Sequence, residues 1–280
     1  MNTELQTKYD NLINIIKDMD SVVVAYSGGV DSTLLLKAAK QALGGKAIAV
    51  TIDSCLYPKR ELEEAIAFCK AEGVEQIIVE RDELAIDGFS ENPTNRCYLC
   101  KHSMLGEIEP IAKERGATIL EGANLDDDVD FRPGRMAVLQ HGARSPLREA
   151  GLRKSDIRAI LREFGISFSE KPSYACLASR FPYGETMTKE KLRRIDSAEQ
   201  YLLDLGFRQI RVRSHENLAR IEADDIDRFF DKDLRENIAR KFKEIGFAYV
   251  SLDLVGYRTG AMNETLSESV KQQAKQPAQV

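Results

Sequence analysis

SVVVAYSGGVDSTLLLKAAKQAL, residues 21–43, joins a valine-rich run to a run of helical spacing through two consecutive glycines. Residues 21–26 are typical of a buried strand, because β-branched side chains dominate them. Residues 32–43 place apolar side chains with the period of a helix. A strand, a tight turn and a helix in succession form the first half of a βαβ unit, so this segment predicts an α/β fold.

Three further runs have the composition of strands: KAIAVTI at 46–52, EQIIVE at 75–80 and ATILEG at 117–122. Segments with helical spacing, such as 58–73, separate them, and an amphipathic helix is expected over residues 5–19. Apolar strands alternating with helices favour a parallel sheet that is covered by helices on both faces. Ligands of such sheets bind beyond the carboxyl ends of the strands, so we expect the active site on the loops there.

The pattern changes past residue 173, where alternating strands follow one another directly. We expect a long helix over 188–205 and two adjacent strands over 209–215 and 217–223. Another helix should follow them, and a last strand is expected over 248–257. This predicts an α/β domain over 1–172 and a small α+β C-terminal domain over 173–263. Residues 264–280 are polar and poor in large apolar side chains, so we expect a disordered tail.

The composition excludes several classes of protein. With 280 residues, 43% of them hydrophobic and 30% charged, the chain has the balance of a globular protein, and it lacks the run of about 18 apolar residues that a membrane span needs. The N-terminus lacks the features of a signal peptide, so a cytoplasmic location is expected. Forty basic against 45 acidic residues give a net charge of −5, which does not favour nucleic acid as a partner.

The glycine loop, Ser27-Gly28-Gly29-Val30-Asp31-Ser32, follows the first predicted strand and begins the first helix. Glycines bring backbone amides close to an anion, and the helix N-terminus adds its positive dipole end. The loop matches neither GxxxxGK[ST] nor GxGxxG. It therefore predicts a phosphate site of another kind; a plain glycine turn with a helix cap is the simpler alternative.

Cys97 and Cys100 lie three residues apart, and Cys176 opens the second region. In a reducing compartment this spacing indicates a metal or redox centre before a disulfide. Three thiolates in a [4Fe–4S] cluster would leave one iron without a protein ligand, and that iron could carry an extra sulfide. Zinc, with His102 as fourth ligand, is the alternative.

The remaining two cysteines carry weaker signals. Cys69 has the spacing of a buried core residue, and Cys55 is ambiguous.

Arg211 and Arg213 alternate along one predicted strand, so both project to the same side. Paired guanidinium groups suit the phosphate of a mononucleotide. Arg180 lies near Cys176 in sequence and is a further substrate-binding candidate. A solvent-facing strand edge is the alternative for these arginines. His215 is a candidate with no assigned role.

The six residues of the glycine loop match the signature SGGxDS of the PP-loop ATP pyrophosphatases, which the chain resembles. The resemblance implies that ATP binds here, that a substrate oxygen attacks the α-phosphate and that pyrophosphate leaves. It also implies ATP-binding roles for residues outside the loop, which are Asp53, Ser54, Gly122, Asp127 and Arg144. Acidic residues within 126–128 would suit Mg²⁺, and Arg132 is a further phosphate candidate.

Later motifs are similar to those of the LarE-type sulfur transferases, which build the nickel-pincer nucleotide cofactor. They are DFRPG at 130–134, GARS at 142–145, Cys176, SRFPYG at 179–184, RVRSH at 211–215, ARIE at 219–222 and SLDLVGYRTG at 251–260. The resemblance implies adenylation of a carboxylate of a pyridinium dicarboxylate mononucleotide, and its conversion to a thiocarboxylate. It also implies substrate or metal contacts for Glu199 and Glu222, and a homo-oligomer, possibly a hexamer, with a sulfide source that the sequence does not identify.

One form of this family has only the cysteine matching Cys176 and sacrifices its sulfur. The presence of Cys97 and Cys100 makes the chain resemble the form with a [4Fe–4S] cluster, and Lys101 beside them would stabilise developing charge. An iron–sulfur tRNA thiolase also combines SGGxDS with three cysteines, although it needs a basic RNA-binding surface. A non-enzymatic adenine-nucleotide-binding regulator with structural zinc is the third reading.

Overall fold

The structure is a computed structural model that describes residues 1–128, 134–172, 175–258 and 260–267. The chain divides into two compact units. The first comprises Met1–Asp82 and Asn95–Tyr174, and the second comprises Glu83–Thr94 and Ala175–Lys271.

The first unit is built on a parallel sheet with the strand order β3-β2-β1-β4. Its strands are β1 (Val22–Ala25), β2 (Ala47–Ser54), β3 (Gln76–Arg81) and β4 (Thr118–Leu120). An isolated parallel bridge between Leu120 and Arg144 continues the sheet beyond β4. Each strand coincides with a run predicted from the sequence, so the α/β prediction is confirmed.

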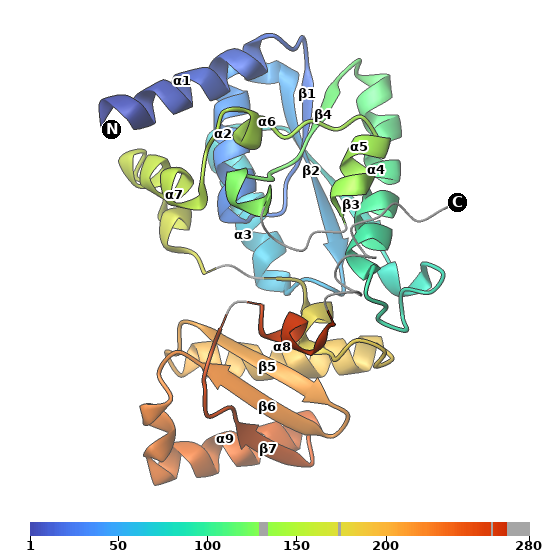
Figure 1. Ribbon diagram of the computed structural model, residues 1–280, viewed down its shortest axis with the longest axis vertical. Coiled ribbons are helices and arrows are strands. Elements are labelled where there is room, and N and C mark those ends of the chain that lie inside the picture. The colour runs from blue at the N-terminus through green and yellow to red at the C-terminus, as the bar shows by residue number, and fades with distance from the viewer. Residues whose placement is uncertain (129–133, 173–174, 259, 268–280) are drawn as a thin grey trace. The chain divides into compact units, whose positions relative to one another are not determined.

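Helices cover both faces of this sheet (Figure 1). They are α1 (Thr3–Lys17), α2 (Val30–Leu43), α3 (Lys59–Glu72), α4 (Arg96–Glu114), α5 (Arg135–Gln140), α6 (Pro146–Glu149) and α7 (Lys154–Glu163). One apolar cluster joins α1, α2, α3, α6 and α7 to one face, and another joins α4 and α5 to the opposite face.

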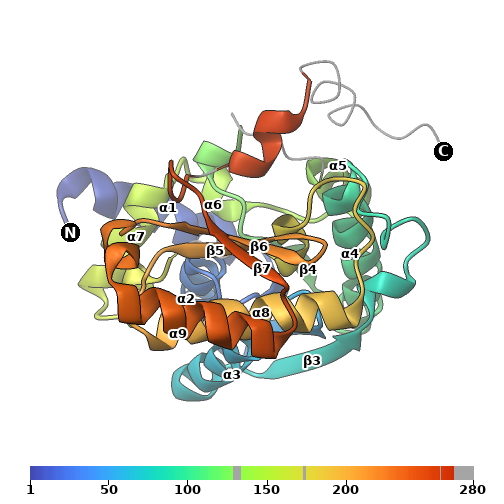
Figure 2. The same cartoon turned by 90° about the horizontal axis from the view of Figure 1, so that it is seen from below.

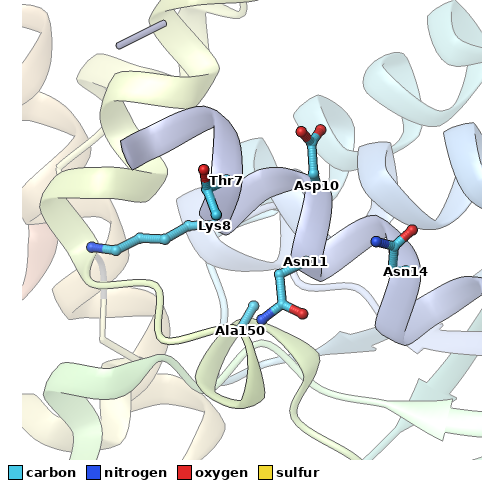
Figure 3. A pocket seen from close by; sticks show the side chains of 6 residues that line it. All are labelled: Thr7, Lys8, Asp10, Asn11, Asn14 and Ala150. Carbon is cyan, nitrogen blue, oxygen red and sulfur yellow. The ribbon is translucent and has the colours of Figure 1, made fainter. Parts of the chain in front are cut away.

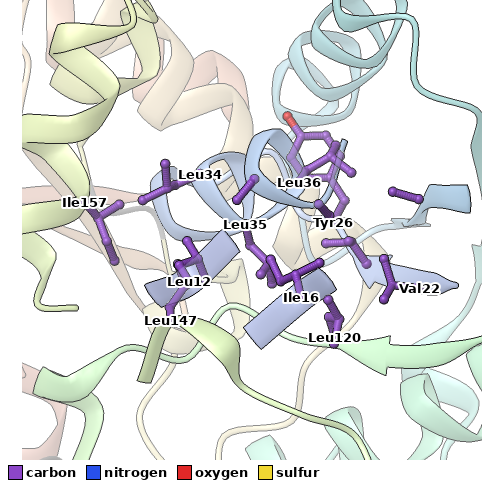
Figure 4. Packing of buried hydrophobic residues seen from close by; sticks show 14 of the residues in the cluster. Leu12, Ile16, Val22, Tyr26, Leu34, Leu35, Leu36, Leu120, Leu147 and Ile157 are labelled. Atoms are coloured by element: carbon purple, nitrogen blue, oxygen red, sulfur yellow. The ribbon is translucent and has the colours of Figure 1, made fainter. Parts of the chain in front are cut away.

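The alternation of side chains along the strands separates these two clusters. Val22 and Val24 of β1 belong to the first cluster, and Val23 between them belongs to the second. Figure 4 shows the first cluster, in which Leu12 and Ile16 of α1 lie among residues of α2 and the sheet. Helix α2 packs against both α1 and the sheet, and this packing holds α2 and the glycine loop that precedes it in place.

The second unit has a three-stranded sheet in the order β5-β6-β7, antiparallel between β5 and β6 and parallel between β6 and β7. Its elements are α8 (Lys189–Asp204), β5 (Ile210–His215), β6 (Leu218–Ala223), α9 (Lys232–Ile245) and β7 (Tyr249–Leu252). Figure 2 shows α8 and α9 together on one side of this sheet. The other face carries Arg211, Arg213, Arg220 and Glu222, because strand register aligns these residues.

The segment Glu83–Thr94 follows β3 in sequence but belongs to the second unit. Asn92, fully buried with φ of +53°, donates from its side-chain amide to the carbonyls of Phe181 (3.1 Å) and Pro182 (2.7 Å). The Gly184 amide donates to the Asn92 carbonyl at 3.0 Å. The sequence-based division, with one boundary near residue 172, does not separate this segment, because its partners lie about ninety positions later.

The expected tail, residues 264–280, lies mostly outside the described residues. Within them a 3₁₀ helix, Ala261–Thr265, extends past the expected start of the tail. None of the helices in the described part of the chain is both long enough and apolar enough to cross a membrane.

Candidate active site

The backbone of the glycine loop adopts a conformation that requires its first glycine. Gly28 has φ of +69°, and a Cβ built there would lie 3.2 Å from both the Ala65 Cβ and the Glu61 carbonyl oxygen. Gly29 is the N-cap of α2 and has an extended backbone, so no side chain caps this helix. The first turn of α2 therefore lacks a side-chain cap, and helix amides of this kind can bind an anion.

The two serine hydroxyls of the loop lie together at this helix end. Ser27 Oγ is 3.2 Å from Ser32 Oγ, and Ser32 Oγ donates to the Gly29 carbonyl at 3.1 Å. Gly122 approaches the same turn so closely that an added Cβ would lie 3.1 Å from the Ser32 nitrogen. The structure thus brings Gly122 and the glycine loop together, although they are far apart in sequence.

Two lysines that the sequence did not identify contact the glycine loop. Lys171 donates to the Gly28 carbonyl at 3.0 Å and pairs with Glu61 at 2.7 Å. Lys154 pairs with Asp31 at 2.7 Å. Neither lysine lies in a local motif, and the contacts span more than a hundred positions, so sequence pattern carries no signal for them.

Glu121, immediately after β4, is a buried carboxylate that was not predicted from the sequence. It accepts hydrogen bonds from Lys101 Nζ at 2.9 Å, from the Ser145 hydroxyl and from the Ala123 amide at 3.2 Å. Burial opposes its ionisation, but Lys101 and the other donors outweigh burial and lower the pKa of Glu121. Its signal is a polar residue at the carboxyl end of a buried parallel strand.

Replacing Glu121 with glutamine is expected to lower the free energy of unfolding at pH 7 by about 1–3 kcal/mol, because the Lys101 ammonium loses a charged acceptor. Since the pKa of Glu121 is lower in the folded protein than in the unfolded chain, its contribution is present above about pH 4.5 and is lost as the pH falls through the folded pKa. Denaturant unfolding at pH 7 and at several acidic pH values would therefore show a flatter acid limb for Glu121→Gln. The exposed Glu63 of α3 provides a control, because Glu63→Gln should leave stability at pH 7 nearly unchanged. A wild-type acid limb in Glu121→Gln would contradict the assignment.

The other predicted ATP-binding residues lie at the carboxyl ends of strands or just beyond. Asp53 and Ser54 end β2, where the Ser54 hydroxyl accepts from the Leu56 amide at 3.0 Å. Asp127 accepts from the Asn124 amide at 3.0 Å, inside its own turn. Arg144 directs its guanidinium to Glu149. Arg132 lies outside the described residues.

Cys97 and Cys100 lie in the first turns of α4, with Cys97 exposed and Cys100 half-buried. Their spacing of three puts both on one face of the helix, near its N-terminal end. Lys101, the residue after Cys100, forms an ion pair with Glu121. This pair of thiols therefore fits two ligands of an iron–sulfur cluster.

His102, the zinc ligand of the alternative reading, makes other contacts. Its Nδ1 lies 3.0 Å from His141 Nε2, and its ring stacks on Tyr98.

Cys176 lies in the second unit, directly before the 3₁₀ helix Leu177–Arg180, and is half-buried. Arg180 and Glu199 are 1% and 0% exposed and form a bidentate pair at 2.8 and 2.9 Å. Burial opposes the ionisation of Glu199, but Arg180 outweighs it and lowers the pKa of Glu199. These two predicted substrate residues are therefore part of a buried ion pair.

Arg211 and Arg213 project from one face of β5, as the alternation predicts, but both are buried. Arg213 makes a bidentate pair with Glu222 at 3.0 and 2.8 Å. Arg211 lies over the ring of Tyr257, and burial, with the charge of Arg180, lowers the pKa of Arg211 to about 10. His215, at the end of β5, has its pKa lowered by burial.

Within the described residues no three His, Cys, Asp or Glu side chains are grouped as a metal site. A surface depression is lined by Thr7, Lys8, Asp10, Asn11, Asn14 and Ala150 (Figure 3). None of these residues belongs to the glycine loop or carries a thiol, so the depression includes neither the predicted phosphate site nor the predicted cluster ligands.

The chain is similar to one family model and to several known proteins. The family model described as NAD synthase matches residues 5–96, which include the glycine loop. The pyridinium-3,5-bisthiocarboxylic acid mononucleotide synthase of Lactiplantibacillus plantarum is 37% identical over 95% of this chain and 97% of its own length. An uncharacterised protein of Synechocystis is 41% identical over 94% of this chain and all of its own.

A tRNA-cytidine(32) 2-sulfurtransferase of Cupriavidus pinatubonensis is 33% identical, but over only 46% of this chain and 44% of its own. Likeness to a tRNA thiolase is therefore confined to part of the chain, whereas likeness to the bisthiocarboxylic acid mononucleotide synthase covers nearly all of it. The same similarity identifies the chain as an enzyme rather than a non-enzymatic nucleotide-binding regulator. The chain belongs to the LarE-type family of ATP-dependent sulfur transferases of the PP-loop class.

Proposed function

We propose that this sulfur transferase activates a carboxylate of a pyridinium dicarboxylate mononucleotide with ATP and converts it to a thiocarboxylate. The observation that carries the proposal is the N-terminal end of α2, without a side-chain cap, behind Gly28 and Gly29, in a chain similar over almost its whole length to a bisthiocarboxylic acid mononucleotide synthase. The substrate carboxylate attacks the α-phosphate of ATP, forming an acyl-adenylate and releasing pyrophosphate. Hydrogen sulfide anion then attacks the acyl carbon, and AMP and a proton leave.

The residues around the glycine loop support the first step. The loop amides and the hydroxyls of Ser27 and Ser32 would bind the leaving pyrophosphate, since they converge at a positive helix end. Lys171 holds the Gly28 carbonyl, and thereby the left-handed turn. Asp53 and Ser54 would contact the adenosine, and Asp127 would help to bind Mg²⁺. For Arg144 to bind phosphate, its guanidinium would have to leave Glu149.

We further propose that Cys97, Cys100 and Cys176 hold a [4Fe–4S] cluster. Such a cluster supplies the sulfide of the second step, because its fourth iron has no protein ligand. The position of Cys97 and Cys100 on one face of α4 supports two of the three ligands. The family resemblance implies Cys176 as the third. The Lys101 ammonium, which Glu121 orients, would stabilise negative charge near this pair.

We also propose that the chain forms a homo-oligomer, because the resemblance to the LarE-type family implies one.

Replacing Cys97 with alanine tests the sulfur source. After anaerobic reconstitution with iron and sulfide, the wild type is expected to bind about four irons per chain and to form more than one thiocarboxylate per chain. Cys97→Ala should lose the iron and form at most one product per chain. Iron analysis, product counting and mass spectrometry of residue 176 provide the measurements.

Cys69→Ala is the matched control. Cys69 is buried in α3, and burial raises its pKa to about 12, so its thiol is inert and its removal should leave iron binding and turnover unchanged. Repeated turnover by Cys97→Ala would contradict the cluster. Dehydroalanine at residue 176 of the wild type after one turnover would instead establish sacrifice of the Cys176 sulfur.

A further inference from the structure

The guanidinium of Arg180 makes its contacts with the protein itself. Nε and Nη2 donate to the two carboxylate oxygens of Glu199, at 2.8 and 2.9 Å. Nη1 donates to the carbonyls of Ala175 (2.8 Å) and Cys176 (3.3 Å) and to the Ser179 hydroxyl (2.8 Å). With the side chain 1% exposed, a substrate phosphate could reach this group only if these contacts broke.

Glu199 connects this guanidinium to the sheet. Its Oε1 also accepts from the Val212 amide of β5 at 2.9 Å, and the side chain is fully buried. A continuous set of hydrogen bonds therefore runs from β5 through Glu199 and Arg180 to the backbone of Cys176. Because the pair is bidentate, it fixes the plane of the guanidinium as well as its position.

A second guanidinium holds the other end of residues 175–179, which we call the Cys176 turn. Arg213 Nη1 donates to the Ser179 carbonyl at 2.8 Å, while its Nε and Nη2 bind Glu222. Three carbonyls of residues 175–179 thus accept hydrogen bonds from arginines anchored by buried glutamates. Cys176, inside this turn, remains half-buried rather than enclosed.

We propose that the Arg180–Glu199 pair is a positioning device for Cys176: it holds the backbone of residues 175–179 so that the Cys176 sulfur is presented to its reaction partners, and it does not bind the substrate. This inference rests on the sulfur chemistry proposed above for Cys176. It assigns Arg180 and Glu199 to the sulfur-transfer step. By contrast, sequence proximity to Cys176 indicated substrate contact for Arg180, and the family resemblance implied substrate or metal contact for Glu199.

Arg180→Lys tests the inference, because lysine keeps the charge but cannot make the forked contacts. Thiocarboxylate formation is expected to fall about 10- to 100-fold in kcat, as small misplacement of a reacting group does. The KM for the mononucleotide and ATP-dependent pyrophosphate release should stay within about twofold, since neither depends on a positioned sulfur. In the metal-free protein, hydrogen exchange at the Ser179 and Phe181 amides should accelerate, because both close this turn.

Arg228→Lys is the matched control in the same unit. Arg228 donates to the Leu205 carbonyl at 2.8 Å and lies over the Phe207 ring, and these contacts do not involve residues 175–179. This variant should therefore change none of these readouts. Should Arg180→Lys fold poorly, Ser179→Ala removes one acceptor of Arg180 and should show the same pattern with smaller amplitude.

A raised KM with unchanged kcat in Arg180→Lys would overturn the inference and make Arg180 a substrate-binding residue. Unchanged kcat and unchanged exchange would overturn it as well. If the wild type forms neither pyrophosphate nor thiocarboxylate, the proposed function fails, and hydrogen exchange still decides whether Arg180 holds the turn.

Discussion

Replacing Gly28 with valine is expected to reduce ATP-dependent pyrophosphate release at least about a hundredfold, because a displacement near 1 Å of binding groups has an effect of that order. Gly28 has φ of +69°, a conformation in which a β-branched residue is a genuine outlier. The added Cβ would also lie 3.2 Å from the Glu61 carbonyl oxygen, a backbone atom that cannot rotate away. The glycine loop must then move off the N-terminal end of α2, and the phosphate-binding amides move with it. Release of pyrophosphate from ATP in the presence of the mononucleotide substrate measures the effect.

Gly73 provides a control with a similar positive φ and with room for a side chain. It ends α3 with φ of +59°, and a Cβ there meets nothing within 4 Å. Gly73→Val therefore carries a backbone cost of about 1–3 kcal/mol in stability without touching the glycine loop. If both variants lose pyrophosphate release equally at a temperature where both are folded, the role given to Gly28 is wrong.

Glu199→Ala is expected to lower the free energy of unfolding by about 3–5 kcal/mol, because it leaves the Arg180 guanidinium buried without its counter-charge. Both side chains are essentially unexposed, so water cannot replace the lost carboxylate. The same change leaves the Val212 amide without its hydrogen-bond acceptor. Denaturant unfolding followed by a probe in the second unit would give the free energy.

The pair Arg258–Glu264 provides the matched comparison. It has the same bidentate geometry, at 2.7 and 3.0 Å, but its side chains are 31% and 54% exposed. Glu264→Ala should therefore cost less than about 1 kcal/mol. Equal small losses in the two variants would show that burial of Arg180 does not make its ion pair indispensable. The double variant Arg180→Met/Glu199→Leu should recover much of the stability, since it removes both charges together.

Much of the fold could be predicted because its signals are local. The four strands of the first sheet are short apolar runs between segments of helical period, and β5 and β6 alternate between apolar and charged residues. The glycine loop could also be recognised from the sequence, because its motif consists of six consecutive residues.

The rest of the site depends on contacts that no local pattern records. Lys154 and Lys171 reach the glycine loop from more than a hundred positions away. Arg180 and Glu199 could be singled out, but their complete burial depends on the packing of the Cys176 turn against α8 and β5, so the sequence alone left substrate contact and solvent exposure as the readings. Glu121 had a usable signal in its place after a buried strand, although only the structure reveals Lys101 as its partner.

The placement of Glu83–Thr94 in the second unit affects the order in which the newly made chain can fold. Asn92 has left the ribosome long before Phe181, its carbonyl acceptor 89 residues later. At translation rates of about 5–20 residues per second, that side chain waits several seconds or more for its partner. During this interval the segment lacks the contacts that bury Asn92 in the folded protein, and we expect it to be open to a chaperone or a protease. Premature termination near residue 172 would leave it in that state permanently, so a released fragment of the first unit alone would carry a ready site for degradation.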